Sequence, residues 1–140
     1  MGDPPAFYFK QSGVVPFRRQ AGGGVEVLLI TSRKGSHWII PKGIVDKGLT
    51  PVESAAKEAW EEAGVRGTVG GRLLGSYQYA KWGGTCTVAV YAMEVHTVAD
   101  SWLESFRERR WFSLATAIEQ VHEKRLKKIL GVFGRIVGEE

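Results

Sequence analysis

Three glutamates lie within five positions (58–62) of the segment KEAWEEAGV, just ahead of Gly64. Carboxylates that face inward together repel one another and need a counter-charge, which a divalent cation with oxygen ligands supplies most simply. The solvated outer face of a helix is the alternative interpretation. The residues around the segment decide between a metal site and a charged surface.

The segment before the glutamates carries the signals of a helix start. Thr50 can cap the helix, Pro51 suits its first position, and Glu53 stands three residues after the cap, as in a capping box. Gly64 tolerates a positive φ and therefore suits the position after the last turn. We predict a helix that begins at about Pro51 and stops at Gly64. Since side chains at i, i+3 and i+4 are neighbours on a helix, the three glutamates converge on one face.

A stripe of small side chains follows an adjoining face of this helix. Its members recur at three- and four-residue steps and are Val52, Ala55, Ala56, Ala59 and Ala63. Small side chains let a helix approach a β-sheet closely. We therefore expect the stripe to be buried against a sheet, with the glutamates on the neighbouring face.

The rest of the chain is expected to form mainly strands. Two apolar segments around the turn QAGGG predict a hairpin at the start, and a second strand pair surrounds the turn KWGG. The expected strands comprise residues 7–19, 25–33, 72–80, 85–95 and 109–114, with an extended segment at 38–45 that Pro41 and Gly43 interrupt. Residues 115–121 and 125–133 are expected to be helical. No internal repeat or linker divides these elements.

Length and composition limit the number of domains and the compartment. A chain of 140 residues with 44% hydrophobic content suits one domain, residues 1–140, around a single core. The one cysteine, Cys86, excludes an intramolecular disulfide and makes a reducing, cytoplasmic setting the natural expectation. No apolar run approaches the ~20 residues that span a bilayer, and the start of the chain lacks the layout of a signal peptide. We expect no membrane partner.

The net charge of +4 permits a nucleic acid, an anionic surface or a phosphate-rich small molecule as partner. The basic residues are scattered except in HEKRLKKIL, where they alternate with Leu126, Ile129 and Leu130 at helical spacing. This pattern favours the solvated face of an amphipathic helix over a nucleic-acid patch. We therefore expect a phosphate-rich small molecule and no nucleic acid. The oligomeric state stays open, and a homodimer is compatible with the sequence.

Residues 43–65 resemble the Nudix box of pyrophosphohydrolases, G-x5-E-x7-R-E-U-x-E-E-x-G-U, in which U is aliphatic. The matching residues, at unbroken spacing, are Gly43, Glu58, Ala59, Glu61, Glu62, Gly64 and Val65. The resemblance implies an α/β (α+β) fold, the Nudix-type α/β/α sandwich with a mixed β-sheet between helices. Leu49 and Lys57 depart from the motif, because the family has glutamate and arginine there. Losing both side chains together removes an ion pair and leaves neither charge unpaired. We therefore expect the loop and helix to be held together less firmly, and the chemistry of the site to be unchanged.

The resemblance also implies hydrolysis of a phosphoanhydride bond, which needs cations to neutralise phosphate oxygens and a base to deprotonate water. Glu58 and Glu62 are the expected ligands of Mg²⁺, or of Mn²⁺ in its place. A backbone carbonyl near Lys42 or Gly43 is expected to help them. Glu61 is then the favoured general base.

Outside the box, the chain resembles the subgroup that hydrolyses diphosphoinositol polyphosphates and diadenosine polyphosphates. The resemblance is clearest in SRKGSHWIIPKG, VRGTVGGRLLGSY and FRERRWFSLATAI. It implies that Arg33 and Arg107 grip phosphates, with Lys10 a weaker candidate for the same role. Lys42 completes the expected substrate-binding set, and Lys81 adds positive charge.

Several other residues have two interpretations. Glu104 is either a ligand of a second metal or an ordinary surface glutamate, and Trp38 and Trp82 either stack on a base or pack within the fold. The histidines lack metal-ligand spacing and receive no role; they are His37, His96 and His122.

The sequence therefore predicts a magnesium-dependent pyrophosphohydrolase that cleaves a nucleoside diphosphate linked to another group. A dinucleoside polyphosphate and a diphosphoinositol polyphosphate are the favoured substrates. Two alternatives stay open, a nucleotide-binding Nudix module without catalysis and an enzyme that removes pyrophosphate from RNA 5′ ends. The intact Glu58, Glu61 and Glu62 argue against the first, and a steep salt dependence would identify the second.

Overall fold

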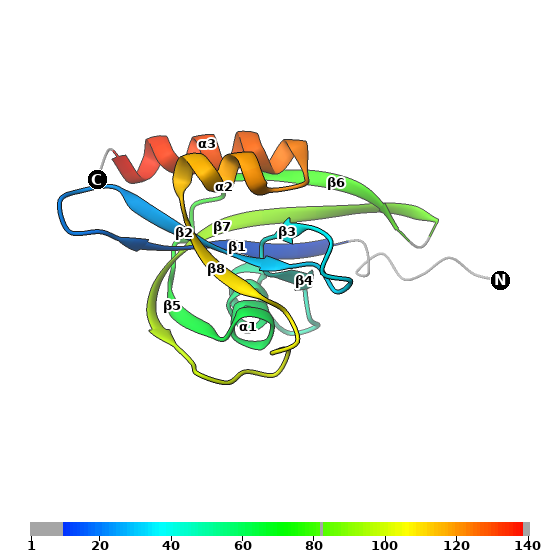
Figure 1. The fold of residues 1–140 in the computed structure, drawn as a ribbon. Helices are drawn as coiled ribbons and strands as arrows, with labels where there is room; N and C mark the ends of the chain where they lie inside the picture. The colour runs from blue at the N-terminus through cyan, green and yellow to red at the C-terminus, as the bar shows by residue number, and fades with distance from the viewer. Residues whose placement is uncertain (1–9, 82, 139–140) are drawn as a thin grey trace.

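A mixed β-sheet lies between helix α1 on one face and helices α2 and α3 on the other (Figure 1). The computed structural model describes residues 10–81 and 83–138, so the expected start of the first strand and Trp82 lie outside the described residues. α1 comprises Pro51–Ala63, α2 comprises Leu114–Gln120, and α3 comprises Lys124–Gly138. The α/β/α sandwich implied by the sequence is confirmed.

The described residues form a sheet of eight strands. These are β1 (Lys10–Arg19), β2 (Val25–Thr31), β3 (Trp38–Ile39), β4 (Lys42–Ile44), β5 (Val65–Val69), β6 (Gly75–Lys81), β7 (Gly84–Val98) and β8 (Arg109–Ser113). The central order is β3-β2-β1-β7-β5, while β4 pairs with β1, β6 with β7 and β8 with β2. β1 and β2 form the predicted antiparallel hairpin, and β1 runs parallel to β7, which makes the sheet mixed.

β5 was not among the strands predicted from the sequence. It follows α1 directly and pairs with β7, with a shift of register between Arg66 and Gly67. A Cβ atom at Gly67 would lie 1.8 Å from the backbone oxygen of Glu94, so this pairing requires a glycine. A short strand with a central glycine has a weak local signal, and its pairing with a long neighbour determines it.

The central hairpin contributes to two cores because successive side chains of a strand point to opposite faces of a sheet. Val14 and Leu28 belong to the cluster that packs against α1. Val15 and Leu29 belong to the cluster that packs against α2 and α3, together with Phe133. The sheet is therefore buried on both faces, and α1 is held in a fixed position above it.

α1 has the predicted ends. The Thr50 side chain accepts a hydrogen bond from the Glu53 backbone N–H, the Glu53 carboxylate accepts one from the Thr50 backbone N–H, and Gly64 has φ 67°. Of the predicted small-residue stripe, Ala55, Ala59 and Ala63 are fully buried, and Ala56 is partly buried. The expected packing of α1 on the sheet is confirmed.

α3 has the expected amphipathic character. It buries Leu126, Ile129 and Leu130 and exposes Lys124 and Lys128. Within the described part of the chain, no helix has the length and apolar character needed to cross a membrane.

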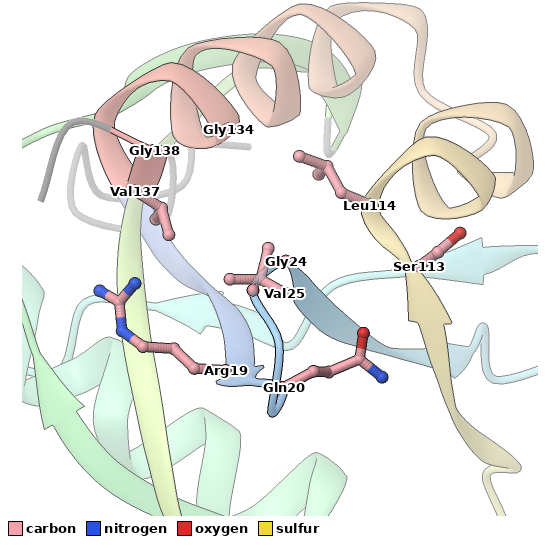
Figure 2. A pocket seen from close by; sticks show the side chains of 10 residues that line it. Arg19, Gln20, Gly24, Val25, Ser113, Leu114, Gly134, Val137 and Gly138 are labelled. Atoms are coloured by element: carbon pink, nitrogen blue, oxygen red, sulfur yellow. The ribbon is translucent and has the colours of Figure 1, made fainter.

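A cavity of about 500 Å³ lies at one end of the sandwich, between the β1–β2 turn, the start of α2 and the end of α3 (Figure 2). Its walls include the apolar side chains of Val25, Leu114 and Val137, with Arg19 as the charged residue. None of the described residues that line it carries a carboxylate.

The loop between β7 and β8 closes the C-terminal end of α1. The last carbonyls of a helix have no partner within the helix. Here the Glu61 carbonyl accepts from the Glu104 backbone N–H at 3.0 Å, and the Glu62 carbonyl accepts from the Trp102 indole N–H at 3.0 Å. The Ala63 carbonyl accepts from Arg109 Nη1 at 2.8 Å. We call these contacts the helix latch.

Arg109 completes the latch by stacking its guanidinium 3.8 Å from the Trp102 ring centroid and by donating a second hydrogen bond to the Ala99 carbonyl. A Cβ atom at Gly64 would lie 2.7 Å from Arg109 Nη1 and 2.9 Å from Trp102 Cβ, so the glycine also permits this close approach. The latch therefore sets the position of the glutamate-bearing turn relative to the loop.

Arg109→Met should lower the free energy of unfolding by about 1 to 3 kcal/mol, because it leaves two backbone carbonyls without their charged donor. Arg110→Met is the matched control. Arg110 neighbours Arg109 on β8 but is exposed and pairs with Glu108, so its replacement should change stability by no more than about 0.5 kcal/mol. Denaturant unfolding of both variants measures the difference, and equal losses would contradict the latch.

Candidate active site

Glu58 and Glu62 lie on successive turns of α1, and a hydrogen bond between their carboxyl groups shifts the pKa of both. Glu62 is buried, with 7% of its surface exposed. Burial, the hydrogen bond to Glu58 and the charge of Glu58 raise the pKa of Glu62 to about 8. Burial is also the main cause that raises the pKa of Glu58. The pair therefore retains a proton near neutral pH when no cation is bound.

β4 covers this pair with backbone. The Lys42 backbone N–H donates to Glu62 Oε1 at 3.2 Å, and Gly43 lies directly against Glu58. A Cβ atom at Gly43 would lie 2.3 Å from the Glu58 carboxyl carbon, so any other residue would displace the glutamate. The pairing of β4 with β1 holds this backbone in place.

The pair has the chemistry of a magnesium site. Two close carboxylates that retain a proton offer oxygen ligands whose repulsion a cation would relieve. Among the described residues, no three side chains of His, Cys, Asp or Glu are already arranged around a common metal position. Mg²⁺ commonly binds through one or two carboxylates and keeps several waters, so Glu58 and Glu62 fit it without a third side chain.

Glu61 points to a different neighbour. Its Oε1 atom lies 3.6 Å from Lys57 Nζ, and its side chain is 24% exposed. Helical spacing thus brings the three carboxylates to one side of α1, but only Glu58 and Glu62 share a hydrogen bond.

The expectation that the loop before α1 and the helix lose their supporting ion pair is wrong. Lys57 Nζ pairs with Asp46 Oδ2 at 2.8 Å, so a lysine on α1 still binds a carboxylate on the preceding loop. The Asp46 backbone N–H also donates to Ser54 Oγ at 3.0 Å, which fixes the same loop to the helix. Asp46 lies close to Leu49 in sequence, and only the path of the loop shows that it reaches Lys57.

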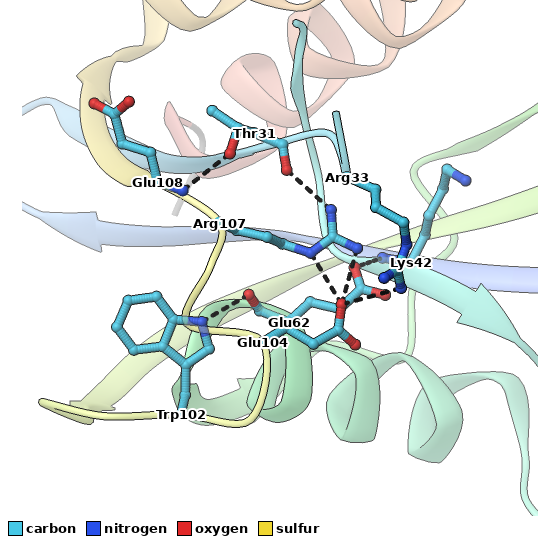
Figure 3. A network of polar contacts seen from close by, with 8 residues as sticks. All are labelled: Thr31, Arg33, Lys42, Glu62, Trp102, Glu104, Arg107 and Glu108. Carbon is cyan, nitrogen blue, oxygen red and sulfur yellow. Dashed lines mark hydrogen bonds and ion pairs between the residues drawn. The ribbon is translucent and has the colours of Figure 1, made fainter. Parts of the chain in front are cut away.

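A cleft of about 370 Å³ opens beside Glu62. Basic and polar side chains line much of it; they are Gln11, Arg33, Lys42, Lys81 and Arg107. Figure 3 shows the guanidinium groups of Arg33 and Arg107 reaching Glu104, while Lys42 contacts Glu62 through its backbone N–H. Of the expected substrate-binding residues, Arg33, Lys42 and Arg107 line this cleft, whereas Lys10 is exposed at the start of β1 and does not line it.

Arg107 is a fixed wall of the cleft. It is buried, donates from Nη1 to the Thr31 carbonyl at 2.9 Å, and donates from Nε and Nη2 to Glu104 Oε1 at 3.0 and 2.9 Å (Figure 3). Glu104 is therefore engaged by Arg107 and also lies 3.8 Å from Arg33 Nη2. Arg33, by contrast, has a side chain that is 74% exposed and is available to a ligand.

Lys42 brings a desolvated charge into the cleft. Burial lowers its pKa, and the charge of Glu62 partly offsets this effect. Its Nζ atom donates to Gln11 Oε1 at 3.5 Å and to Tyr79 Oη at 3.4 Å. An anion in the cleft would gain a strong interaction with this ammonium group.

An aromatic cavity of about 180 Å³ adjoins the cleft, since Ile39 and Lys42 line both. Its walls include Trp38 and two histidines that stack with ring centroids 3.8 Å apart, His37 and His122. Trp38 also packs edge-to-face on Phe112, so it is both a packing residue and a wall of the cavity. The two histidines received no role from the sequence, because no local spacing indicated that they meet.

Comparison with known proteins places these features in one family. Residues 9–131 match the family model described as NUDIX domain. Nudix hydrolase 16, mitochondrial, of Arabidopsis thaliana is 32% identical in an alignment 137 positions long that covers 85% of this chain and 76% of that protein. Diphosphoinositol polyphosphate phosphohydrolase 3-beta of Bos taurus is 34% identical over 137 residues, which cover 91% of this chain and 80% of that protein.

Solved structures agree on the fold. A C. elegans Ap4A hydrolase superimposes with a TM-score of 0.77 and 26% identity, covering 92% of this chain and 98% of the other. A binary complex of a C. elegans Ap4A hydrolase gives a TM-score of 0.81 with 24% identity, covering 94% and 99%. The buried glutamate pair, the basic cleft and the match over most of the chain lead to one conclusion: the chain belongs to the Nudix hydrolase family.

Proposed function

We propose that this protein is a magnesium-dependent hydrolase that cleaves a phosphoanhydride bond of a dinucleoside polyphosphate. The observation that carries the proposal is the continuity of three features: a proton-retaining glutamate pair, a cleft lined with basic side chains, and an aromatic cavity that joins this cleft at Lys42. A polyphosphate chain matches the cleft by charge, and a nucleobase matches the cavity by its flat apolar faces.

Glu58 and Glu62 are the proposed ligands of Mg²⁺, with Mn²⁺ as a substitute and a backbone carbonyl near Gly43 as a further ligand. The metal would supply charge neutralisation at the phosphate oxygens and a lower pKa for a bound water. Arg33, Lys42 and Arg107 would hold the remaining phosphate oxygens, Arg107 in a position already fixed by Thr31 and Glu104.

Glu61 is the proposed general base. It would take a proton from the attacking water as the new P–O bond forms and the bridging P–O bond breaks, which yields two phosphorylated products. The nearby Lys57 keeps the Glu61 side chain on the same side of α1. The Asp46–Lys57 brace supports this geometry without the glutamate and arginine of the family motif.

The aromatic cavity favours a substrate with a base over an inositol polyphosphate, although relatives carry diphosphoinositol polyphosphate phosphohydrolase in their names. Inositol pyrophosphates, RNA 5′ ends and binding without hydrolysis are the competing outcomes of a substrate panel. A cytoplasmic location stays a prediction, since relatives are named for mitochondria and chloroplasts. A homodimer also stays a prediction.

In a panel of dinucleoside polyphosphates, nucleoside triphosphates, nucleotide sugars, inositol pyrophosphates and 5′-triphosphate RNA, the protein with Mg²⁺ should have its highest kcat/KM on diadenosine tetraphosphate. His122→Ala should raise KM for that substrate about tenfold, because it removes one stacked wall of the cavity. His122→Ala should leave KM for any inositol pyrophosphate unchanged.

His96→Ala is the matched control for this variant, since His96 lies on β7 and binds Thr68 Oγ1 instead of lining the cavity. Preference for an inositol pyrophosphate or for RNA in the panel, or equal effects of the two histidine variants, would contradict the proposed substrate. Binding of all substrates without turnover would identify a non-catalytic module.

Two variants distinguish the proposed base, Glu61, from the proposed metal ligand, Glu62. Glu61→Gln should lower kcat roughly a hundredfold or more, because it removes the base, and should leave the affinity for Mg²⁺ unchanged. Glu62→Gln should weaken Mg²⁺ binding itself, because it removes a ligand. Steady-state kinetics and calorimetric titration with Mg²⁺ measure the two effects. Wild-type turnover in Glu61→Gln, or wild-type Mg²⁺ affinity in Glu62→Gln, would reject the corresponding role.

The raised pKa of Glu62, about 8, predicts how Mg²⁺ binding depends on pH. Below that pH the carboxyl pair holds a proton that Mg²⁺ must displace, so affinity should rise with pH by up to about tenfold per unit and level off above about pH 8. Without metal, the folded state binds more protons than the unfolded chain above the ordinary pKa of a glutamate, so its stability should fall as pH rises towards 8.

Calorimetry in buffers of different ionisation enthalpy counts the released proton, and denaturant unfolding with a chelator measures the stability. Glu62→Gln should remove both pH dependences, whereas a pH-independent Mg²⁺ affinity of the wild type would contradict the shared proton.

A further inference from the structure

Two large apolar side chains are exposed on the loop between β7 and β8. Leu103 is 77% exposed and Phe106 is 57% exposed. Single exposed apolar residues are common, so exposure by itself indicates nothing. The position of Phe106 relative to the cleft distinguishes it from Leu103.

Phe106 lies beside two of the basic walls of the cleft. Its ring centroid is 5.3 Å from the guanidinium carbon of Arg33 and 5.3 Å from that of Arg107. Both arginines line the cleft. The aromatic cavity meets the same cleft at other residues, Ile39 and Lys42. Phe106 does not itself line the cleft, but it lies next to two of the arginines that do, away from the place where the aromatic cavity joins it.

The backbone that carries Phe106 is fixed. The helix latch joins this loop to α1 through Trp102 and the Glu104 N–H, and the Arg107 N–H donates to the Glu104 carbonyl at 3.0 Å. The Arg107 side chain is buried, and both terminal nitrogens of its guanidinium donate hydrogen bonds within the protein. An exposed ring on a rigid support loses little conformational freedom when a ligand stacks on it.

We infer that Phe106 is a second base-stacking subsite, which binds the distal nucleobase of a dinucleoside polyphosphate whose first base occupies the aromatic cavity. This inference rests on the proposed function and extends it, because it assigns both ends of the substrate. The phosphate chain then lies along Arg33, Lys42 and Arg107, between the two aromatic positions. An inositol polyphosphate has no base for either position, and a mononucleotide has a base for only one.

The test compares diadenosine tetraphosphate with adenosine 5′-tetraphosphate, which has the same phosphate chain and one base fewer. Phe106→Ala should raise KM for the dinucleotide about tenfold, as expected for one lost base–aromatic stack, and should change KM for the mononucleotide less than about twofold. Phe106→Trp should restore KM for the dinucleotide. Leu103→Ala, the exposed neighbour, is the matched control and should change neither value.

Three results would overturn the inference: equal KM for wild type and Phe106→Ala, an equal rise for both substrates, or a rise in Leu103→Ala as large as in Phe106→Ala. These failures leave the wild type active on dinucleotides and so leave the proposed function intact. A wild type that cleaves other members of the panel but no dinucleoside polyphosphate would instead overturn the proposed function, and this inference with it.

Discussion

The contact of β4 with the glutamate pair of α1 is the constraint on which the site depends. Glu58 and Glu62 are pressed against the backbone at Lys42 and Gly43, where a Cβ atom would collide with Glu58 and where one N–H binds Glu62. Two carboxylates held so closely in a buried place keep a proton, which costs stability that a bound cation would recover. The fold therefore maintains a repulsive arrangement because α1 and β4 are each fixed by other contacts.

Those other contacts act at both ends of α1. At its start, the capping box and the Asp46–Lys57 ion pair join the helix to the preceding loop. At its end, Trp102 and Arg109 bind the last carbonyls and bring the β7–β8 loop against the same turn that carries Glu62. Small buried side chains between the two ends let the helix lie close to the sheet. A surface ion pair adds little energy by itself, so the latch and the buried alanines bear most of the positioning.

The same loop connects the carboxylates of α1 to the basic side of the cleft. Arg107 is fixed by Thr31 on β2 and by Glu104, whose own N–H binds the end of α1. The distance between the Glu62 carboxylate and the Arg107 guanidinium is thus set by one short loop. Arg33, by contrast, has an exposed side chain whose ion pair with Glu104 is long, so its position is less tightly fixed than that of Arg107.

Local interactions explain what the sequence determined by itself. The ends of α1, its alanine stripe and the convergence of Glu58, Glu61 and Glu62 depend on residues within a few positions of one another, so spacing alone predicts them. The apolar patterns of the long strands and of α3 likewise predict those elements. The spacing of the glutamates and glycines in residues 43–65 predicts the family.

Tertiary structure decided everything that depends on distant segments meeting. Val65–Val69 became a strand through pairing with β7, and Asp46 took over the brace because its loop turns back towards Lys57. His37 and His122 became one stacked wall only because the turn before β3 lies beside the residues that follow α2. Lys10 lies outside the cleft, because the start of β1 places its side chain in solvent. Such contacts carry no local sequence signal, since the packing of the sheet and helices sets which side chains come together.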